Sequence, residues 1–412
     1  MNGRKLFLTL AFALIGLAFC LTTAAASSLR TPGVSARSIT IGGTFPFSGP
    51  ASLYAGIGRG QAAYFEYVND HGGVNGREIK FITLDDGYNP ANTVQLTRRL
   101  VEQDNVFAVV GSLGTEQNLA TRPYLNEKKV PQVLLSTGAS VWGTDYKKYP
   151  WTIGWQPNYI AEAFIYGRFI VTKMPQAKIG VLYQNDAYGH DYITGLKKGL
   201  GAKKNKIVET QGYEVTSPDV ASQIAKLKAS GANTLFVAAT PTFAIQSIVI
   251  AYKLGWHPQI FMNSVSATDT LMGLAARNSN AAAVNGIISV EYRMDPGDPR
   301  YAKPGAIDLY RSIMAKYNPK GNLKDAFNVY GMAQAWTFVY ALKHAFKNPT
   351  RAGLMKALLT MNTKENPFLL PGMHLFTSPS DRFPLNQGVL IRYQDGGFKP
   401  FGHLLTYPRA KR

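Results

Sequence analysis

The stretch Val109-Val110-Gly111-Ser112-Leu113-Gly114-Thr115-Glu116-Gln117-Asn118 joins an apolar run typical of a β-strand to a helix-compatible segment through two glycines and a small polar tip. Such a strand–loop–helix junction exposes backbone N–H groups and hydroxyls that bind small ligands. A second junction of this kind follows at Val133-Leu134-Leu135-Ser136-Thr137-Gly138-Ala139-Ser140. If the two strands are parallel neighbours, their polar tips meet at one edge of a sheet, where open α/β folds hold ligands.

The chain before and around this stretch alternates between strand and helix patterns. Asn89-Pro90, for example, supplies the N-cap and first-position proline of a helix. We predict strands at 39–44, 78–84 and 106–110 and helices at 55–69, 89–103 and 117–126. This β-α-β-α-β order indicates a parallel sheet covered on both faces and wound right-handed.

Prolines and tryptophans interrupt the alternation at residues 150–157, and the same winding then restarts. We predict strands at 178–183, 207–213, 234–238 and 259–262 and helices at 160–172, 188–200, 220–230 and 242–254. A strand at 286–292 leads into Asp295-Pro296-Gly297-Asp298-Pro299, followed by helices at 306–317, 325–345 and 351–361 and a β-hairpin around 389–397. The pattern predicts two similar α/β lobes, with segments from the end of the chain completing both.

The first 26 residues form a predicted signal peptide. Arg4 and Lys5 precede an apolar run over 6–21, and Ala24-Ala25-Ala26 offers an A-x-A cleavage site. The run is shorter than the roughly 20 residues of a spanning helix, so a membrane anchor is disfavoured. Lipid modification at Cys20 is the alternative, which ranks second because Phe19 is bulky where such sites prefer small residues. A Ser/Pro/Gly linker over 27–37 follows.

The composition further limits the class of protein to which this chain can belong. Cys20 is the single cysteine, so a mature chain without it has no disulfides and depends on its hydrophobic core. About 386 residues remain after cleavage (412 − 26), which favours two domains. The net charge falls from +19 to +17 when Arg4 and Lys5 are removed. Nucleic acid is excluded as a partner by the predicted export and by the absence of arginine-rich or aromatic RNA motifs.

No catalytic, metal or cofactor site is predicted. The six histidines are dispersed, and neither a G-x-S-x-G elbow nor a P-loop lysine motif occurs. Asp85-Asp86 lies at a strand end, where adjacent side chains point to opposite faces and form no dyad. These observations disfavour an enzyme.

Several motifs in order carry a resemblance to a known family. They are Thr44-Phe45-Pro46-Phe47-Ser48-Gly49-Pro50 with Tyr54, Asn69-Asp70-His71-Gly72-Gly73-Val74-Asn75-Gly76-Arg77, Asp85-Asp86, Val110-Gly111 and Ser136-Thr137-Gly138-Ala139. Together they resemble the leucine/isoleucine/valine-binding proteins, which are periplasmic binding proteins of fold type I that serve ABC importers. The likeness covers roughly residues 38–400 and is strongest in the first 140.

The resemblance implies two Rossmann-like lobes with parallel sheets, joined by a three-crossing hinge that traps a small ligand on closing. Lobe 1 would take residues 38–155 and 286–367, and lobe 2 residues 156–285 and 368–412. The protein would lie in the periplasm or cell envelope, act as a monomer and deliver its ligand to an ABC permease. Presentation of the ligand state to a membrane receptor kinase is an alternative.

The resemblance also assigns ligand-binding residues in the first lobe. Tyr54 would flank the ligand, and the segment Leu113, Gly114 and Thr115 would hold its carboxylate. Ala139 and Ser140 would supply the facing backbone and hydroxyl contacts. Alternative roles are an N-cap for Thr115, worth about 1 kcal/mol, and a surface-turn hydroxyl for Ser140.

Two positions of the second lobe depart from the family pattern. Tyr188 matches its aromatic wall, with packing as the alternative, but Val265 stands where amino-acid binders place the acid that pairs with the ligand's ammonium. Thr240 stands near another aromatic contact. Asp186 or Asp269 would have to compensate. Because an ammonium buried without a carboxylate is costly, we predict a carboxylate or amide ligand, with a branched-chain amino acid as the alternative.

Overall fold

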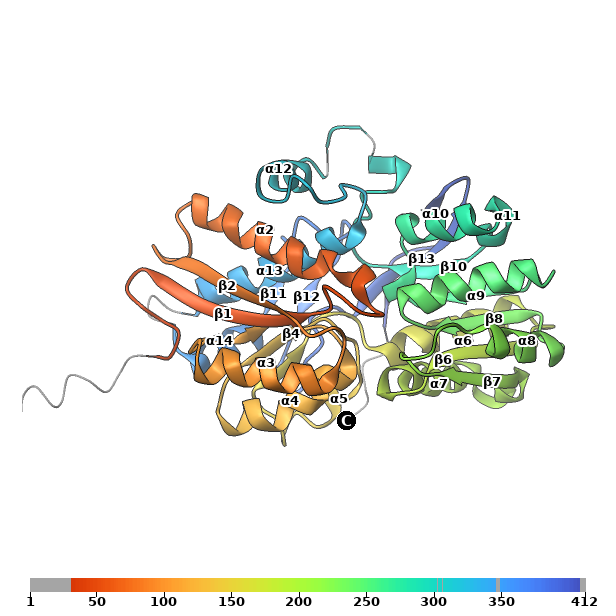
Figure 1. The fold of residues 1–412 in the computed structure, drawn as a ribbon, viewed down its shortest axis with the longest axis horizontal. Coiled ribbons are helices and arrows are strands. Elements are labelled where there is room, and N and C mark those ends of the chain that lie inside the picture. Colours follow the sequence, from red (N-terminus) through yellow and green to blue (C-terminus); the bar gives the residue numbers. More distant parts are fainter. Residues whose placement is uncertain (1–30, 302, 306, 346–348, 408–412) are drawn as a thin grey trace, which may run out of the picture.

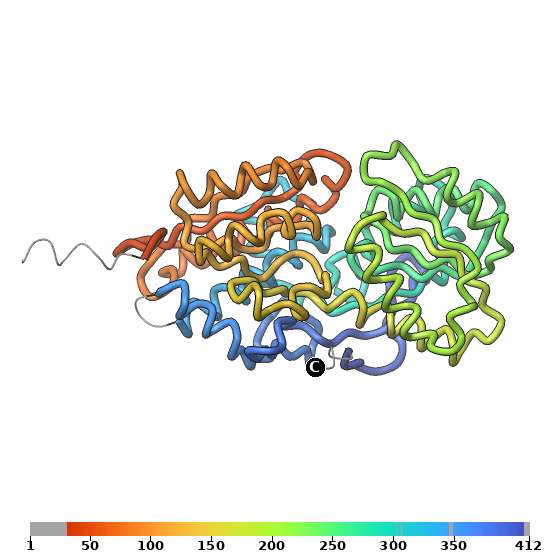
Figure 2. The backbone as a smooth tube through the Cα atoms, turned by 90° about the horizontal axis from the view of Figure 1, so that it is seen from below, coloured from red at the N-terminus to blue at the C-terminus, as the bar shows by residue number. Residues whose placement is uncertain are grey.

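The computed structural model describes residues 31–301, 303–305, 307–345 and 349–407. Two α/β lobes lie side by side, each built on its own sheet (Figures 1 and 2). This architecture agrees with the predicted fold class. The predicted signal peptide, its cleavage site at Ala26 and Cys20 lie outside the described residues.

The first sheet is parallel throughout, with the strand order β2-β1-β3-β4-β5. Its strands are β1 (Ser38–Phe45), β2 (Glu78–Asp85), β3 (Val109–Val110), β4 (Gln132–Leu135) and β5 (Thr152–Gly154). The strands β3 and β4 are parallel neighbours, and beyond them Ser136 N donates to the Ser112 carbonyl at 3.0 Å. The two polar tips therefore meet at one sheet edge, as the sequence predicts.

Helices cover both faces of this sheet (Figure 1). They are η1 (Ser52–Tyr54), α2 (Gly56–Asp70), α3 (Pro90–Glu102), α4 (Thr115–Glu127), α5 (Val141–Thr144), α12 (Asp308–Tyr317), α13 (Ala326–His344) and α14 (Arg351–Leu358). The predicted cap at Asn89 is present, since its Oδ1 accepts from Ala91 N at 2.9 Å. Helix α13 is buried along most of its length and packs against α2.

The second lobe has a mixed sheet with the order β14-β13-β10-β9-β8-β6-β7, and β15 pairs with β13. Its strands are β6 (Ile179–Gln184), β7 (Ile207–Tyr213), β8 (Thr234–Ala238), β9 (Gln259–Met262), β10 (Ile288–Glu291), β13 (Gln387–Gln394), β14 (Gly397–Pro400) and β15 (Leu405–Thr406). Its helices are α6 (Tyr159–Lys173), α7 (Ala187–Leu200), η2 (Gly201–Lys206), α8 (Ala221–Ala229), α9 (Pro241–Lys253), η3 (Ser264–Ser266), α10 (Asp269–Asn278) and α11 (Ala281–Val284). The antiparallel pair β13–β14 confirms the predicted hairpin.

The chain passes between the lobes after β5, after β10 and before β13 (Figure 1). Strand β10 pairs with β9 and β13, so it belongs to the second sheet and not to lobe 1, where the expected range 286–367 placed it. Residues 368–386, expected in lobe 2, contact lobe 1: Arg382 Nη1 donates to the carbonyls of Pro150 and Thr152 at 2.8 and 2.9 Å. A strand pattern next to a crossing does not reveal which sheet it joins, which explains both differences.

Short elements account for the other differences from the sequence-based prediction. Strand β5 lies within the segment expected to be only a crossing, and α10 was not predicted. Two further short strands, β11 (Asn362–Thr363) and β12 (Leu375–Phe376), pair outside the main sheets, and the helix η4 (Pro299–Tyr301) follows the second crossing. The remaining predicted helices and strands are present, some with the predicted bounds and others with shifted ends.

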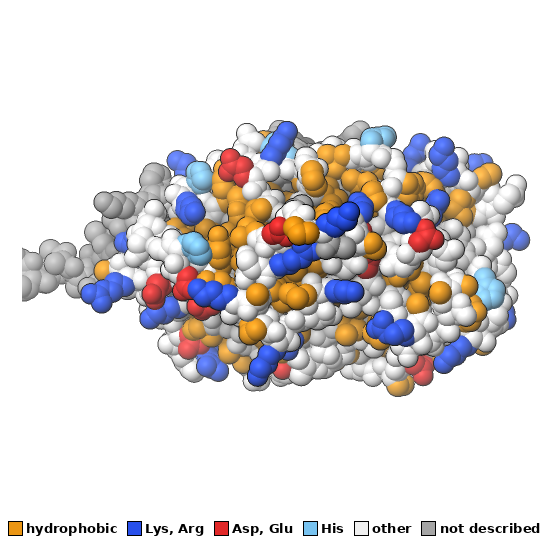
Figure 3. Space-filling view, turned by 90° about the horizontal axis from the view of Figure 1, so that it is seen from above, with side chains coloured by type: hydrophobic (Ala, Val, Ile, Leu, Met, Phe, Trp, Pro, Cys, Tyr) orange, Lys and Arg blue, Asp and Glu red, His pale blue; other side chains and the backbone are white. Residues whose placement is uncertain are grey.

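Lysine and arginine side chains are scattered over the surface. On the face seen from above, lysine and arginine side chains are spread among polar, acidic and apolar ones (Figure 3). That face therefore shows no continuous basic stripe. Of the helices in the described ranges, none combines the length and apolar character required to cross a membrane.

Candidate functional site

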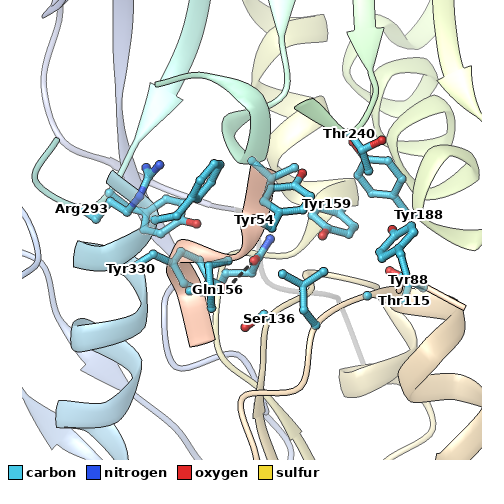
Figure 4. Close-up of a pocket in the computed structure, with 16 residues that line it drawn as sticks. Tyr54, Tyr88, Thr115, Ser136, Gln156, Tyr159, Tyr188, Thr240, Arg293 and Tyr330 are labelled. Atoms are coloured by element: carbon cyan, nitrogen blue, oxygen red, sulfur yellow. Dashed lines mark hydrogen bonds between the residues drawn. The ribbon is translucent and has the colours of Figure 1, made fainter. Parts of the chain in front are cut away.

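A pocket of about 460 Å³ lies between the lobes beside the crossings (Figure 4). Its walls come from both lobes and from the crossing segments. The lining residues are Tyr54, Ile57, Tyr88, Leu113, Gly114, Thr115, Ser136, Gln156, Tyr159, Tyr188, Thr240, Val265, Tyr292, Arg293, Phe327 and Tyr330. Seven of the nine residues proposed from the sequence are in this set: Tyr54, Leu113, Gly114, Thr115, Tyr188, Thr240 and Val265.

The loop Leu113–Thr115 forms one end of the pocket. Gly114 has φ +102°, a conformation that L side chains rarely adopt, and it is the N-cap residue of α4. Because no side chain caps this helix, its first turn offers backbone N–H groups to the pocket. Thr115 is therefore not the N-cap, which corrects that alternative; its Oγ1 lies 2.6 Å from Thr137 Oγ1.

The bend at the second tip is held by the inner helix α13. Leu134 has φ +54° in β4, where the register with β5 shifts, although it is a bulky buried residue. Gln334 of α13 donates to the Leu134 carbonyl and to Ser136 Oγ, the latter at 3.0 Å. These hydrogen bonds fix Ser136, which lines the pocket.

The second lobe contributes aromatic and small side chains. Tyr188 Oη accepts from Asn263 Nδ2 at 2.6 Å, which leaves its proton available to a ligand. Thr240 N donates to Tyr213 Oη at 3.0 Å. Val265 lies in η3, whose first residue donates to the buried Glu162 carboxylate. The lining of this lobe is therefore polar only through hydroxyls.

Tyrosines dominate the walls. Tyr54 packs edge-on against Phe327 with ring centroids 5.0 Å apart, and Tyr159 packs edge-on against Tyr188 at 5.1 Å. Burial raises the pKa of Tyr54 and Tyr188 well above the ordinary value, so both remain neutral hydroxyls. The pocket thus combines flat apolar walls with neutral hydrogen-bonding groups.

Arg293 is the charged residue of the lining, and no lining residue is acidic. Its side chain lies near the rings of Tyr292 and Phe327, with the guanidinium carbon 5.7 and 5.9 Å from their centroids. The pocket therefore has a net positive lining. Gln156 lies nearer the middle of the pocket, where its Oε1 accepts from Tyr330 Oη at 2.6 Å (Figure 4).

Ala139 and Ser140 do not line the pocket. Ser140 instead joins the lobes, because its N and Oγ donate to the two carboxylate oxygens of Asp191 at 2.6 and 2.8 Å. It is half-buried, so the alternative of a surface-turn hydroxyl is also wrong. The sequence pattern did not reveal this role because the partner lies on α7 of the other lobe.

The two aspartates considered as ammonium partners have structural roles. Asp186 is the N-cap of α7, where its Oδ1 accepts from Gly189 N at 3.1 Å. Asp269 begins α10, and its Oδ1 accepts from Phe398 N at 2.7 Å. Neither lines the pocket, so neither replaces the acid missing at Val265.

Nine lining residues were not proposed from the sequence: Ile57, Tyr88, Ser136, Gln156, Tyr159, Tyr292, Arg293, Phe327 and Tyr330. Tyr88 follows a predicted strand end, and Gln156 and Tyr159 adjoin the first crossing, so position alone could have suggested them. Tyr292 and Arg293 similarly precede the second crossing. Phe327 and Tyr330 lie within a helix, where nothing in the sequence distinguishes them from core residues.

Two α/β lobes, a hinge of three crossings and an interlobe pocket define the class of type I periplasmic binding proteins. Residues 38–397 match the profile of a family described as "Periplasmic binding protein", and the chain belongs to this family. The family consists of extracytoplasmic solute-binding proteins, not enzymes; its members bind small molecules and work with ABC transporters.

Characterised relatives carry amino-acid-binding names. An "Amino acid binding protein" of Pseudomonas aeruginosa is 23% identical over 325 residues, covering 76% of this chain and 81% of the relative. "Leu/Ile/Val-binding protein homolog 1" of Brucella abortus is 23% identical over 342 residues, covering 79% and 83%.

Solved structures share the fold at low identity. A fatty acid ABC transporter substrate-binding protein from Thermomonospora curvata has a TM-score of 0.77 at 23% identity, covering 92% of this chain and 95% of the other. A branched chain amino acid ABC transporter protein from Thermus thermophilus with bound valine has a TM-score of 0.79 at 18% identity, covering 90% and 97%. Proteins named for a fatty acid and for an amino acid therefore share this fold.

Proposed function

We propose that this protein is the solute receptor of an ABC importer and that its ligand is a small organic carboxylate or amide without an ammonium group. The observation that carries the proposal is the charge of the pocket lining, which contains Arg293 and no acidic residue. The loop Leu113–Thr115 at the start of α4 would hold the acidic or carbonyl group.

The absence of a lining carboxylate disfavours an α-amino acid. A buried ammonium requires a negative partner, because desolvation of an unpaired charge costs more than hydrogen bonds to neutral groups return. The position that would supply this partner is Val265, and its neighbours Ser264 and Ser266 are neutral. A carboxylate alone would instead find N–H groups, hydroxyls and a guanidinium.

Matched pairs of ligands test the proposal. We expect 3-phenylpropanoate and 4-methylpentanoate to raise the melting temperature of the purified protein, whereas phenylalanine and leucine, which add only the ammonium, do not. Saturation at one hundred times the dissociation constant should stabilise the fold by about 2.7 kcal/mol. Stabilisation by leucine or phenylalanine alone would overturn the proposal.

Binding of a branched-chain amino acid is the second candidate, supported by the names of the relatives. The same leucine titration decides between the two. A further part of the proposal is export with cleavage after Ala26, in the periplasm or envelope. The intact mass of the exported protein distinguishes this cleavage from lipidation at Cys20, since the two products differ by several residues.

A further inference from the structure

Arg293 lies at the opposite end of the pocket from Thr115, with Tyr54 and Tyr159 between them (Figure 4). Arg293 is only 2% exposed. Its Nε is buried without a hydrogen-bond partner, and none of the hydrogen bonds or ion pairs among the described residues involves its guanidinium. Burying guanidinium N–H groups without an acceptor is costly. An anionic group of a ligand at this position would satisfy them.

A second buried donor lies between the two ends of the pocket (Figure 4). Gln156 is 2% exposed and lines the pocket, and its Nε2 has no hydrogen-bond partner although its Oε1 accepts from Tyr330. The two donors come from different crossings, Gln156 from the first and Arg293 from the second. Both side chains have a buried nitrogen without an acceptor among the described residues.

The carboxylates near Arg293 are engaged elsewhere. Glu291 Oε2 lies 3.4 Å from Arg300 Nη2, and Asp298 also pairs with Arg300. Asp295 accepts from Asp269 N and Gly297 N, both at 2.9 Å. Asp325 Oδ1 accepts from Phe327 N at 2.9 Å.

Burial also reduces the negative charge of this group. Burial is the largest cause that raises the pKa of Glu291 to about 8, and repulsion by the Asp295 carboxylate is the second largest. Burial likewise raises the pKa of Asp325 to about 6. The charge of Arg293 favours the ionised forms of Glu291, Asp295 and Asp325, but none of these carboxylates accepts a hydrogen bond from its guanidinium among the described residues.

We propose that Arg293 forms a second anion subsite and that the ligand is a dicarboxylic acid whose second carboxylate binds there. The inference rests on the proposed function, because the first carboxylate occupies the Leu113–Thr115 end. Between the two ends lie aromatic rings, which suit a flat apolar middle section such as a benzene ring.

Calorimetric titration with two ligands of one skeleton tests the inference. We expect 3-(4-carboxyphenyl)propanoate to bind the wild-type protein about 10- to 100-fold more tightly than 3-phenylpropanoate, the range expected for hydrogen bonds to a charged group. In Arg293→Gln this preference should disappear, with little change in the affinity for 3-phenylpropanoate.

Two variants guard against effects of folding or of general charge. Arg293→Lys retains the positive charge and should retain part of the preference. Arg392→Gln removes an exposed arginine of β13 that does not line the pocket, and should retain all of it. The melting temperature of each variant verifies that it is folded.

The outcomes separate the inference from the proposed function. Equal affinity of the wild-type protein for both acids, or equal losses for both in Arg293→Gln, overturns the second subsite while the carboxylate receptor stands. If neither acid binds and leucine does, the proposed function and the inference fail together. If Arg293→Gln does not fold, loss of the preference in Arg293→Met supports the subsite and its retention counts against it.

Discussion

The two ends of the pocket offer different kinds of hydrogen-bond donor to a ligand. At the Leu113–Thr115 end, the donors are backbone groups held by the fold: Gly114 at positive φ and the uncapped first turn of α4. At the other end, the donor is the side chain of Arg293, and Gln156 lies between the two ends (Figure 4). A backbone site survives most substitutions, whereas a side-chain site changes with one residue. Ligand specificity is therefore expected to be determined mainly at the crossings.

The largest effect should follow from Gly114→Ala. Its Cβ would lie 2.0 Å from Gln117 Oε1 and 3.0 Å from a Tyr88 ring carbon, at a φ of +102°. We expect about 1–3 kcal/mol of strain and a loss of at least tenfold in affinity for 3-phenylpropanoate, measured by calorimetry. Gly255→Ala is the control, because that glycine also has positive φ but has nothing within 4 Å. Equal losses in both variants would mean that the loop end contributes no specific contact.

Thr115→Ala should have the next largest effect. It removes the hydroxyl 2.6 Å from Thr137 Oγ1, which retains the hydrogen bond from Ala139 N at 3.3 Å. We expect binding of 3-phenylpropanoate to weaken by about 1–3 kcal/mol, measured by calorimetry, while Thr115→Ser retains most of the affinity. An unchanged affinity in Thr115→Ala would reduce the residue to a packing role.

Ser140→Ala should weaken both ends equally. Ser140 Oγ donates to Asp191 across the lobes at 2.8 Å and does not line the pocket. Loss of this hydrogen bond should make the free energy of lobe closure less favourable by about 1 kcal/mol. The affinities for the monocarboxylate and the dicarboxylate should therefore fall by the same few-fold factor. Ser140→Thr, which keeps the hydroxyl, is the control. A change in the ratio of the two affinities would show that Ser140 contacts the ligand after all.

The smallest change in binding is expected from pH, and only at the Arg293 end. As the pH rises through the Glu291 pKa of about 8, an added negative charge joins Asp295 and Asp298 around Arg293 and Arg300. The dicarboxylate should then bind a few-fold more weakly, and the monocarboxylate should not change. Glu291→Gln should flatten this dependence, and an equal response of both ligands would contradict it.

Glu291 also links pH to stability. Folding raises its pKa from 4.5 to about 8, so between these values the folded chain retains a proton that the unfolded chain releases. The free energy of unfolding should therefore fall as pH rises through this window. Thermal melts of the wild-type protein and of Glu291→Gln measure this contribution.

Much of the fold could be predicted because helix and strand patterns are local. The strands at 207–213, 234–238 and 259–262 coincide with β7, β8 and β9. The sheet membership of β10 could not be predicted, because it depends on pairing with distant β13. Strand β5 was hidden by the prolines and tryptophans around it.

The residues of the candidate site also include some that a local motif predicts and others that only the tertiary structure brings to the pocket. The loop Leu113–Thr115 is a local motif, and the sequence located it at the pocket. Arg293 is a single arginine among many, and only the crossing geometry brings it to the lining. The family resemblance placed Ser140 against the ligand, and its partner Asp191, which lies 51 residues away on the other lobe, could not be found from a local pattern.

The bonds between Ser140 and Asp191 need no ligand, and neither does that from Ala187 N to Glu116 Oε1 at 3.0 Å. They lower the free energy of the closed form whether or not it is loaded. Any ligand gains apparent affinity from this bias, because less of its binding energy is spent on closing the lobes. If the proposed importer docks the closed form, empty molecules that close spontaneously would present the same outer surface as loaded ones and would compete with them for docking.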